Sequence, residues 1–254
     1  MILNSISLGD GPPLVLLHGL FGAARNLGAL ARGLSTRARV VCMDLRNHGA
    51  SPHGAGMDFA TMAEDVAQTC TSLGLGPVRL AGHSLGGKAA MYLALSQPEA
   101  VERLAVLDIA PVAYQHGYAR IVQAMLAITL TPGLTRHAAD AALVDEVPEA
   151  PMRAFLLSNL ALGEAPHWRI GLAEIAAAMP QLLDWVDPPA CAPFRNPTLF
   201  LRGGESDYVG PQAERVINRL FPAARQHAIA GANHWLHADK PAEVLAELEA
   251  FFFP

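Results

Sequence analysis

A serine framed by glycines offers the clearest chemistry in this sequence. Gly82-His83-Ser84-Leu85-Gly86 follows an apolar run, Val78-Arg79-Leu80-Ala81, and precedes a helical pattern over residues 87–96. Between a strand and a helix, Gly-x-Ser-x-Gly is typical of a nucleophile elbow, a sharp turn that exposes the serine hydroxyl. The neighbours must be small because backbone passes close by on such a strained turn. The pattern therefore predicts Ser84 as a nucleophile.

A serine nucleophile needs a histidine to take its proton and a carboxylate to orient that histidine. His234 lies in a Gly-Ala-Asn-His loop after the last predicted strand, where such a base is expected. Asp108 ends the strand before a long helical segment, and Asp207 follows the strand after it. Both strands end on the same rim of a parallel sheet, so either aspartate could be the acid, and at most one of them is.

Backbone N–H groups near Ser84 are expected to bind the oxyanion of the reaction. His18-Gly19 follows the first clear strand, so we assign the N–H groups of Leu20, with Phe21 less favoured, and of Leu85. Side chains near these loops and at the start of the helical segment are candidate substrate contacts, although ordinary packing explains each of them equally well. They are His18, Phe21, Tyr114, Arg120, Tyr208 and Trp235.

Strands and helices that could position these residues alternate along the chain. Near-continuous apolar strands between amphipathic helices predict an α/β fold with a mostly parallel sheet covered on both faces. Strands are expected at residues 14–17, 39–43, 78–81, 101–107, 198–201 and 226–229. Helices are expected at residues 26–34, 59–73, 87–96 and 212–220, and from 241 to the C-terminus.

This alternation stops in the middle of the chain. Residues 112–190 show helical patterns interrupted by prolines and no evident strand. We therefore expect an α/β core of residues 1–111 and 191–254 and a helical cap, residues 112–190, inserted after the sixth strand. A cap of this kind would lie over the strand ends as a lid and favour an apolar acyl group.

Composition excludes several classes of function. The chain of 254 residues is 52% hydrophobic and 16% charged, with a net charge of −5 and no basic block. Nucleic acid and membranes are therefore not expected as partners. The expected partner is a small-molecule ester substrate. The first eleven residues lack a signal-peptide pattern, and the three cysteines are scattered, so we expect a cytoplasmic protein without disulfides. The sequence carries no signal for an oligomeric state.

Five motifs resemble those of α/β-hydrolases, and more narrowly those of the YbfF-type serine esterases. They are Leu16-Leu-His-Gly-Leu-Phe-Gly22, Asp44-Leu-Arg-Asn-His-Gly49, Gly82-His-Ser-Leu-Gly-Gly-Lys-Ala89, Asp108-Ile-Ala-Pro111 and Gly231-Ala-Asn-His-Trp-Leu-His237. The resemblance implies a cytosolic serine esterase or acyl-thioesterase that acts on small to medium acyl groups and needs no cofactor. It places the acid at the position of Asp108, while this chain carries Asp207 as well.

Other functions fit the motifs less well. Gly82 to Lys88 matches the phosphate-binding G-x-x-x-x-G-K pattern, but Ala89 stands where a hydroxyl ligand of Mg²⁺ is required. His234 and His237, or His48 and His53, lack a third ligand at a suitable spacing, so no metal site is expected. The remaining alternatives are a carbon–carbon bond hydrolase with the same residues and a non-catalytic small-ligand-binding protein with this fold.

Overall fold

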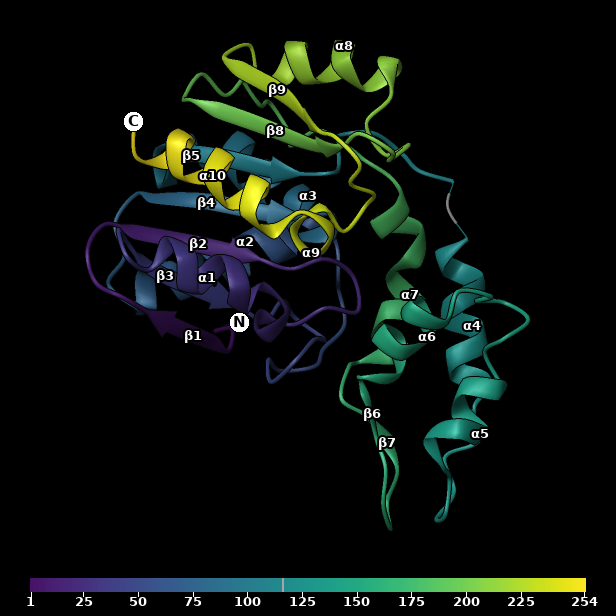
Figure 1. The fold of residues 1–254 in the computed structure, drawn as a ribbon. Helices are drawn as coiled ribbons and strands as arrows, with labels where there is room; N and C mark the ends of the chain where they lie inside the picture. Colours follow the sequence, from purple (N-terminus) through teal and green to yellow (C-terminus); the bar gives the residue numbers. More distant parts are fainter. Residues whose placement is uncertain (116) are drawn as a thin grey trace.

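A seven-stranded sheet lies at the centre of the computed structural model, which describes residues 1–115 and 117–254 (Figure 1). The strand order is β1-β3-β2-β4-β5-β8-β9. β1 runs antiparallel to β3, and the other neighbours are parallel. The strands are β1 (Ser5–Leu8), β2 (Pro13–Leu17), β3 (Arg39–Met43), β4 (Val78–His83), β5 (Val101–Leu107), β8 (Thr198–Gly203) and β9 (Ala224–Ile229).

Burial on both faces explains why the central strands are continuously apolar. Leu14 and Leu16 of β2 face one layer of helices, while Val15 and Leu17 face the other, and all four side chains are at most 2% exposed. β3 and β5 have the predicted bounds. β1 was not predicted, because it is an edge strand whose side chains are half-buried or exposed and therefore lacks the apolar run.

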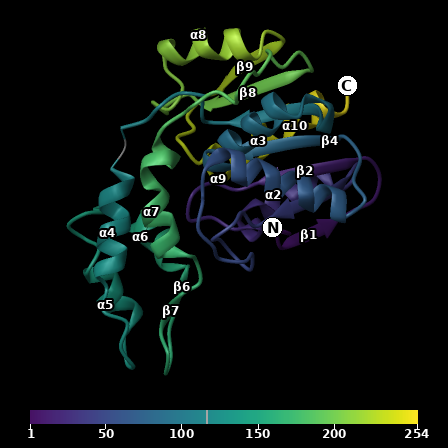
Figure 2. The same ribbon diagram turned by 180° about the vertical axis from the view of Figure 1, so that it is seen from behind.

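Helices cover both faces of this sheet, as Figures 1 and 2 show from opposite sides. The predicted α/β-hydrolase architecture, a mostly parallel sheet flanked by helices, is confirmed. One face is covered by α1 (Gly28–Leu34), α9 (Leu236–Asp239) and α10 (Pro241–Phe252). The 3₁₀ turn η1 (Ala24–Leu27) precedes α1. The other face is covered by α2 (Phe59–Ser72), α3 (Leu85–Ser96), followed by the 3₁₀ turn η2 (Pro98–Ala100), and α8 (Pro211–Leu220).

Between β5 and β8 the chain leaves the sheet and forms a layer beyond the carboxyl ends of these strands (Figure 1). Its elements are α4 (Tyr118–Ala127), α5 (Arg136–Ala141), α6 (Ala150–Leu157), β6 (Leu160–Ala161), β7 (His167–Trp168) and α7 (Leu172–Leu183). β6 and β7 pair as a small antiparallel hairpin that was not predicted, since strands of two residues show no period. In the described chain this segment follows β5, the fifth strand. The prediction placed it after a sixth strand, but residues 1–12 contain only one strand, β1.

One aromatic side chain packs against the core helices where the chain returns from this layer to the sheet. Trp185, just after α7, places its ring centroid 5.8 Å from that of Phe59 and 6.2 Å from that of Tyr92. Its Nε1–H donates to the carboxylate of Asp187 at 2.8 Å. These contacts join the inserted layer to α2 and α3. Among the described helices, none combines the length and apolar character that a membrane span requires.

Candidate active site

Ser84 lies on a strained turn between β4 and α3. Its backbone has φ 51° and ψ −118°, a conformation that costs a non-glycine residue on the order of 1–3 kcal/mol. A Cβ atom on Gly82 would lie 2.2 Å from the Gly86 carbonyl oxygen, and one on Gly86 would lie 2.5 Å from that of His18. The two flanking glycines are therefore required by close backbone contacts, and the turn lifts the Ser84 hydroxyl clear of the sheet.

Three polar side chains form one hydrogen-bonded line at the carboxyl ends of the strands. The Ser84 hydroxyl donates to His234 Nε2 at 3.0 Å, and His234 Nδ1–H donates to Asp108 Oδ2 at 2.8 Å. Ser84 follows β4, Asp108 follows β5, and His234 follows β9. They are 9%, 0% and 8% exposed, respectively, so the line lies almost wholly inside the protein. This geometry can move a proton from the serine to the imidazole and leave the positive charge facing a carboxylate.

The structure brings Asp108, rather than Asp207, to the histidine. Asp108 Oδ1 accepts the Gly203 N–H at 2.8 Å, and Oδ2 also accepts the hydroxyl of Ser206. These hydrogen bonds fix the orientation of the Asp108 carboxylate relative to His234. Asp207 is exposed, and the Nδ1 atom of His234 is already occupied by Asp108.

Two backbone N–H groups next to Ser84 are without a hydrogen bond in the described part of the chain, those of Leu20 and Leu85. The N–H of Leu85 is at the N-terminus of α3, where the helix dipole favours negative charge. The N–H of Phe21 instead donates to His48 Nε2 at 3.1 Å, and the Phe21 ring is 1% exposed. The geometry therefore favours the N–H of Leu20 over that of Phe21 as the candidate oxyanion donor from this loop.

The side chains of His18 and His48 hold this loop in place through hydrogen bonds to its backbone. Nδ1–H of His18 donates to the Gly19 carbonyl at 2.8 Å, and its Nε2 accepts the Leu45 N–H at 3.0 Å. The rings of His18 and His48 lie 5.1 Å apart and are fully buried. Burial lowers the pKa of both imidazoles, that of His48 to about 3, so both are neutral. His18 thus has a structural role in this loop, and its predicted contact with a substrate stays a prediction.

A further pair of imidazoles packs behind His234. The ring centroid of His83 lies 4.9 Å from that of His234 and 4.5 Å from that of His237. Its Nε2–H donates to the backbone carbonyl of His234 at 2.9 Å, which fixes the loop that carries the base. Burial lowers the pKa of His83 well below its usual value and that of His237 to about 4.

Aromatic side chains surround the exposed edge of His234. The Tyr208 ring stacks on the imidazole with centroids 3.7 Å apart and planes inclined by 14°, and Trp235 packs edge-on at 5.5 Å. The Tyr208 and Tyr118 hydroxyls are hydrogen-bonded at 2.8 Å, and the Tyr114 hydroxyl donates to the Tyr208 carbonyl at 2.8 Å. Burial raises the pKa of all three tyrosines, so their hydroxyls stay protonated.

A cavity of about 40 Å³ adjoins Ser84 and is mostly apolar. Lys88, one helical turn after Ser84, lines it with an ammonium group that sequence reasoning assigned to an ordinary helix position. Its Nζ donates to the Asp184 carbonyl at 2.8 Å and lies 4.8 Å from the Tyr114 ring centroid. Burial lowers the pKa of Lys88 to about 7. The sequence signal that could have found Lys88 is its spacing from Ser84, because residues four apart lie on the same face of a helix.

Arg120, another predicted substrate contact, does not line the cavity beside Ser84. Its side chain is 76% exposed and pairs with the Glu146 carboxylate at 2.8 Å on the surface of the inserted layer. Sequence reasoning also missed Ser206 and Asn159. Ser206 bonds Asp108, and the Asn159 side-chain amide donates to the Phe21 carbonyl at 2.8 Å. No motif marks either of them, since each acts through contacts between distant segments.

Comparison with known proteins identifies the family of this chain. A family profile described as alpha/beta hydrolase fold matches residues 12–241. The chain belongs to the α/β-hydrolase family. It is 40% identical to the mouse sn-1-specific diacylglycerol lipase ABHD11 over 97% of this chain and 84% of that protein. It is 37% identical to the Escherichia coli esterase YbfF over 95% of this chain and 93% of the relative.

Solved structures agree at the level of the whole fold. A marine microorganism esterase superposes with a TM-score of 0.94 at 32% identity, over 98% of this chain and 99% of that one. The resemblance to the YbfF-type esterases is therefore confirmed. The prediction of a serine ester hydrolase is confirmed at the level of enzyme class.

Proposed function

We propose that this α/β-hydrolase cleaves carboxylic esters, including acyl thioesters, of small to medium acyl chains through an acyl-enzyme on Ser84. The observation that carries the proposal is the continuous hydrogen-bonded line from Ser84 through His234 to Asp108. The names of the relatives, esterases and lipases, support the same class of reaction.

Acylation would begin with transfer of the Ser84 proton to His234 Nε2 while Ser84 Oγ bonds the carbonyl carbon. The developing oxyanion would be bound by the N–H groups of Leu20 and Leu85. The imidazolium would then give its proton to the leaving oxygen or sulfur, and the bond to that atom would break. The alcohol or thiol departs and an ester on Ser84 remains.

Deacylation would use the same groups in reverse. A water molecule gives a proton to His234, and its oxygen bonds the acyl carbon. The proton then returns to Ser84 Oγ as the acyl–enzyme bond breaks, which releases the carboxylic acid. Asp108 stays ionised throughout, holds the Nδ1–H tautomer of His234 and stabilises the transient imidazolium.

Residues 112–190 would serve as a cap over this chemistry. The cavity beside Ser84 is closed from the cap side by Tyr118 of α4 and by Met179, Leu182 and Leu183 of α7. Apolar walls of this kind exclude water and suit an uncharged acyl group. The volume of about 40 Å³ favours the small end of the proposed range of acyl chains.

The test is hydrolysis of p-nitrophenyl esters from acetate to decanoate by the wild type and by Ser84→Ala. We expect turnover that falls by roughly 10³-fold or more in Ser84→Ala, because the nucleophile is lost. Ser96→Ala, on the last turn of the same helix, is the matched control and keeps wild-type rates. Turnover that survives in a folded Ser84→Ala protein contradicts the proposal.

A further inference from the structure

Two hollows meet at a pair of tyrosines beside the candidate active site. The small cavity next to Ser84 is also lined by Leu20 and Leu85, the residues whose N–H groups we propose to bind the oxyanion. A second hollow of about 320 Å³ lies between α4, α6 and the loop that carries Trp235. Tyr118 and Tyr208 line both hollows, so their hydrogen-bonded hydroxyls form the wall between them.

The position of His234 indicates which part of an ester belongs in each hollow. His234 must protonate the leaving oxygen, so the alcohol has to lie on the imidazole side of the reacting carbon. Tyr208 and Trp235, which line the second hollow, both pack against the imidazole ring of His234. The acyl group then lies on the other side, near the N–H groups of Leu20 and Leu85.

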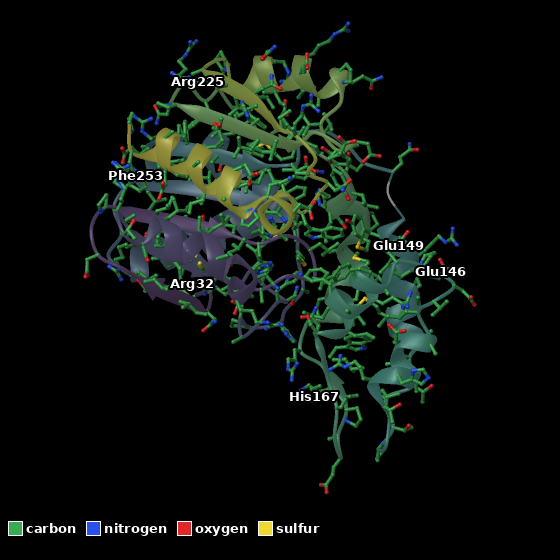
Figure 3. The ribbon with its side chains drawn as sticks, in the orientation of Figure 1. Arg32, Glu146, Glu149, His167, Arg225 and Phe253 are labelled. Atoms are coloured by element: carbon green, nitrogen blue, oxygen red, sulfur yellow. The ribbon has the colours of Figure 1, made fainter. Side chains whose placement is uncertain are left out.

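The walls of the second hollow select the chemistry of its occupant. Ile121, Val147, Met152 and the Trp235 ring are apolar, and the volume lies within the range typical of ligand pockets. Glu146 and Glu149 lie at its outer rim on the cap, where Figure 3 shows them away from the sheet. Glu146 is paired with Arg120, and the carboxylate of Glu149 adds a negative charge that disfavours an anionic group at this rim. An uncharged alkyl or aryl alcohol fits these walls.

On the basis of the function proposed above, we propose that the second hollow is the leaving-group subsite, so that the enzyme prefers a short acyl group on a larger apolar alcohol. An ester that spans both hollows parts the Tyr118–Tyr208 hydroxyl contact. A neutral hydrogen bond of this kind contributes only about 1 kcal/mol, so a bound apolar chain offsets its loss.

The isomeric esters hexyl acetate and ethyl hexanoate test this assignment, because they contain the same atoms and differ only in which side carries the chain. We expect kcat/KM for hexyl acetate to exceed that for ethyl hexanoate by about tenfold or more, since several methylenes gain an apolar wall. Released acid is measured by titration. Equal rates, or a preference for ethyl hexanoate, overturn the assignment.

Variants of α4 test whether the preference for hexyl acetate arises in the second hollow. Ile121→Trp fills the second hollow and should lower the ratio of kcat/KM for hexyl acetate to kcat/KM for ethyl acetate by about tenfold. Leu126→Trp, an exposed position of the same helix, is the control and should change neither rate. Met152→Trp, on the opposite wall, replaces Ile121→Trp if that variant does not fold. An unchanged ratio in a folded filling variant also overturns the assignment.

The two proposals fail in different ways. If none of these esters is hydrolysed with a dependence on Ser84, the proposed ester hydrolysis fails. If ethyl acetate is hydrolysed through Ser84 but the isomers are not discriminated, only the leaving-group subsite fails.

Discussion

At the scale of single residues, the site depends on three side chains that different strands deliver to one rim. Ser84, His234 and Asp108 could each be found because each lies in a recognisable loop at a strand end. Asp108 and Asp207 could not be separated from sequence, because the same rim receives both strands. The choice depends on a hydrogen bond between residues 126 positions apart in the chain.

Asp108→Asn and Asp207→Asn separate these two aspartates in solution. We expect kcat for ester hydrolysis to fall by roughly 10³–10⁴-fold in Asp108→Asn, because His234 loses its carboxylate and the tautomer it imposes. Asp207→Asn should stay within a few-fold of the wild type, since its side chain is exposed. Steady-state kinetics on p-nitrophenyl butyrate, with circular dichroism to check folding, decide between them. A larger loss in Asp207→Asn would reverse the assignment.

Tyr208 provides a second comparison at this scale. Its ring face stacks on the imidazole and can stabilise the imidazolium that forms during catalysis, an interaction of roughly 0.5–2 kcal/mol. We expect Tyr208→Leu to lower kcat about 3- to 30-fold. Tyr208→Phe keeps the ring and should restore most of kcat. If kcat falls as much in Tyr208→Phe as in Tyr208→Leu, the hydroxyl contact to Tyr118 supports catalysis and the stacked ring does not.

At the scale of elements, the elbow joins β4 and α3 with almost no free space. The sequence predicted both elements and the need for glycine at their junction, since strand, turn and helix are local patterns. β1 and the β6–β7 hairpin escaped prediction, because the first is half exposed and the second has two residues per strand. The hydrogen bond from Lys88 to the Asp184 carbonyl also escaped prediction, because it joins α3 to a segment almost a hundred residues away in the chain.

Gly86→Ala tests how tightly this element is packed. The added Cβ would lie 2.5 Å from the His18 carbonyl oxygen and 2.7 Å from the Leu17 carbonyl, so we expect a loss of stability of about 1–3 kcal/mol. Gly76→Ala is the control, because nothing lies within 4 Å of its added Cβ. Urea unfolding followed by circular dichroism measures both. Equal stabilities of the two variants would show that the elbow can relax around the methyl group.

At the scale of the whole molecule, the protein buries an unusual amount of neutral imidazole. His18, His48, His83 and His237 all have a pKa that burial lowers below its usual value. Between pH 6.5 and these lowered values the unfolded chain binds more protons than the folded one. The free energy of unfolding must therefore fall as the pH falls below about 6.5.

The size of this effect can be measured. A fully buried histidine that stays neutral at pH 5 contributes a loss of about 2 kcal/mol between pH 7 and pH 5. We expect His237→Phe to remove about 1–2 kcal/mol of that loss, because the pKa of His237 is lowered to about 4. The exposed His137→Gln should leave the dependence unchanged. Urea titrations at several pH values test this, and a wild type equally stable at pH 7 and pH 5 would contradict it.

The anchoring of Trp185 against Phe59 and Tyr92 has a spectroscopic consequence. The chain has three tryptophans, and they report on three different places. Trp168 lies in the β6–β7 hairpin, Trp185 lies at the joint between cap and core, and Trp235 lies beside His234. With Trp168 and Trp235 replaced by phenylalanine, the remaining fluorescence would come from the joint alone. Its emission maximum would then report on the packing of this joint and would show, without any attached dye, whether residues 112–190 move relative to the sheet.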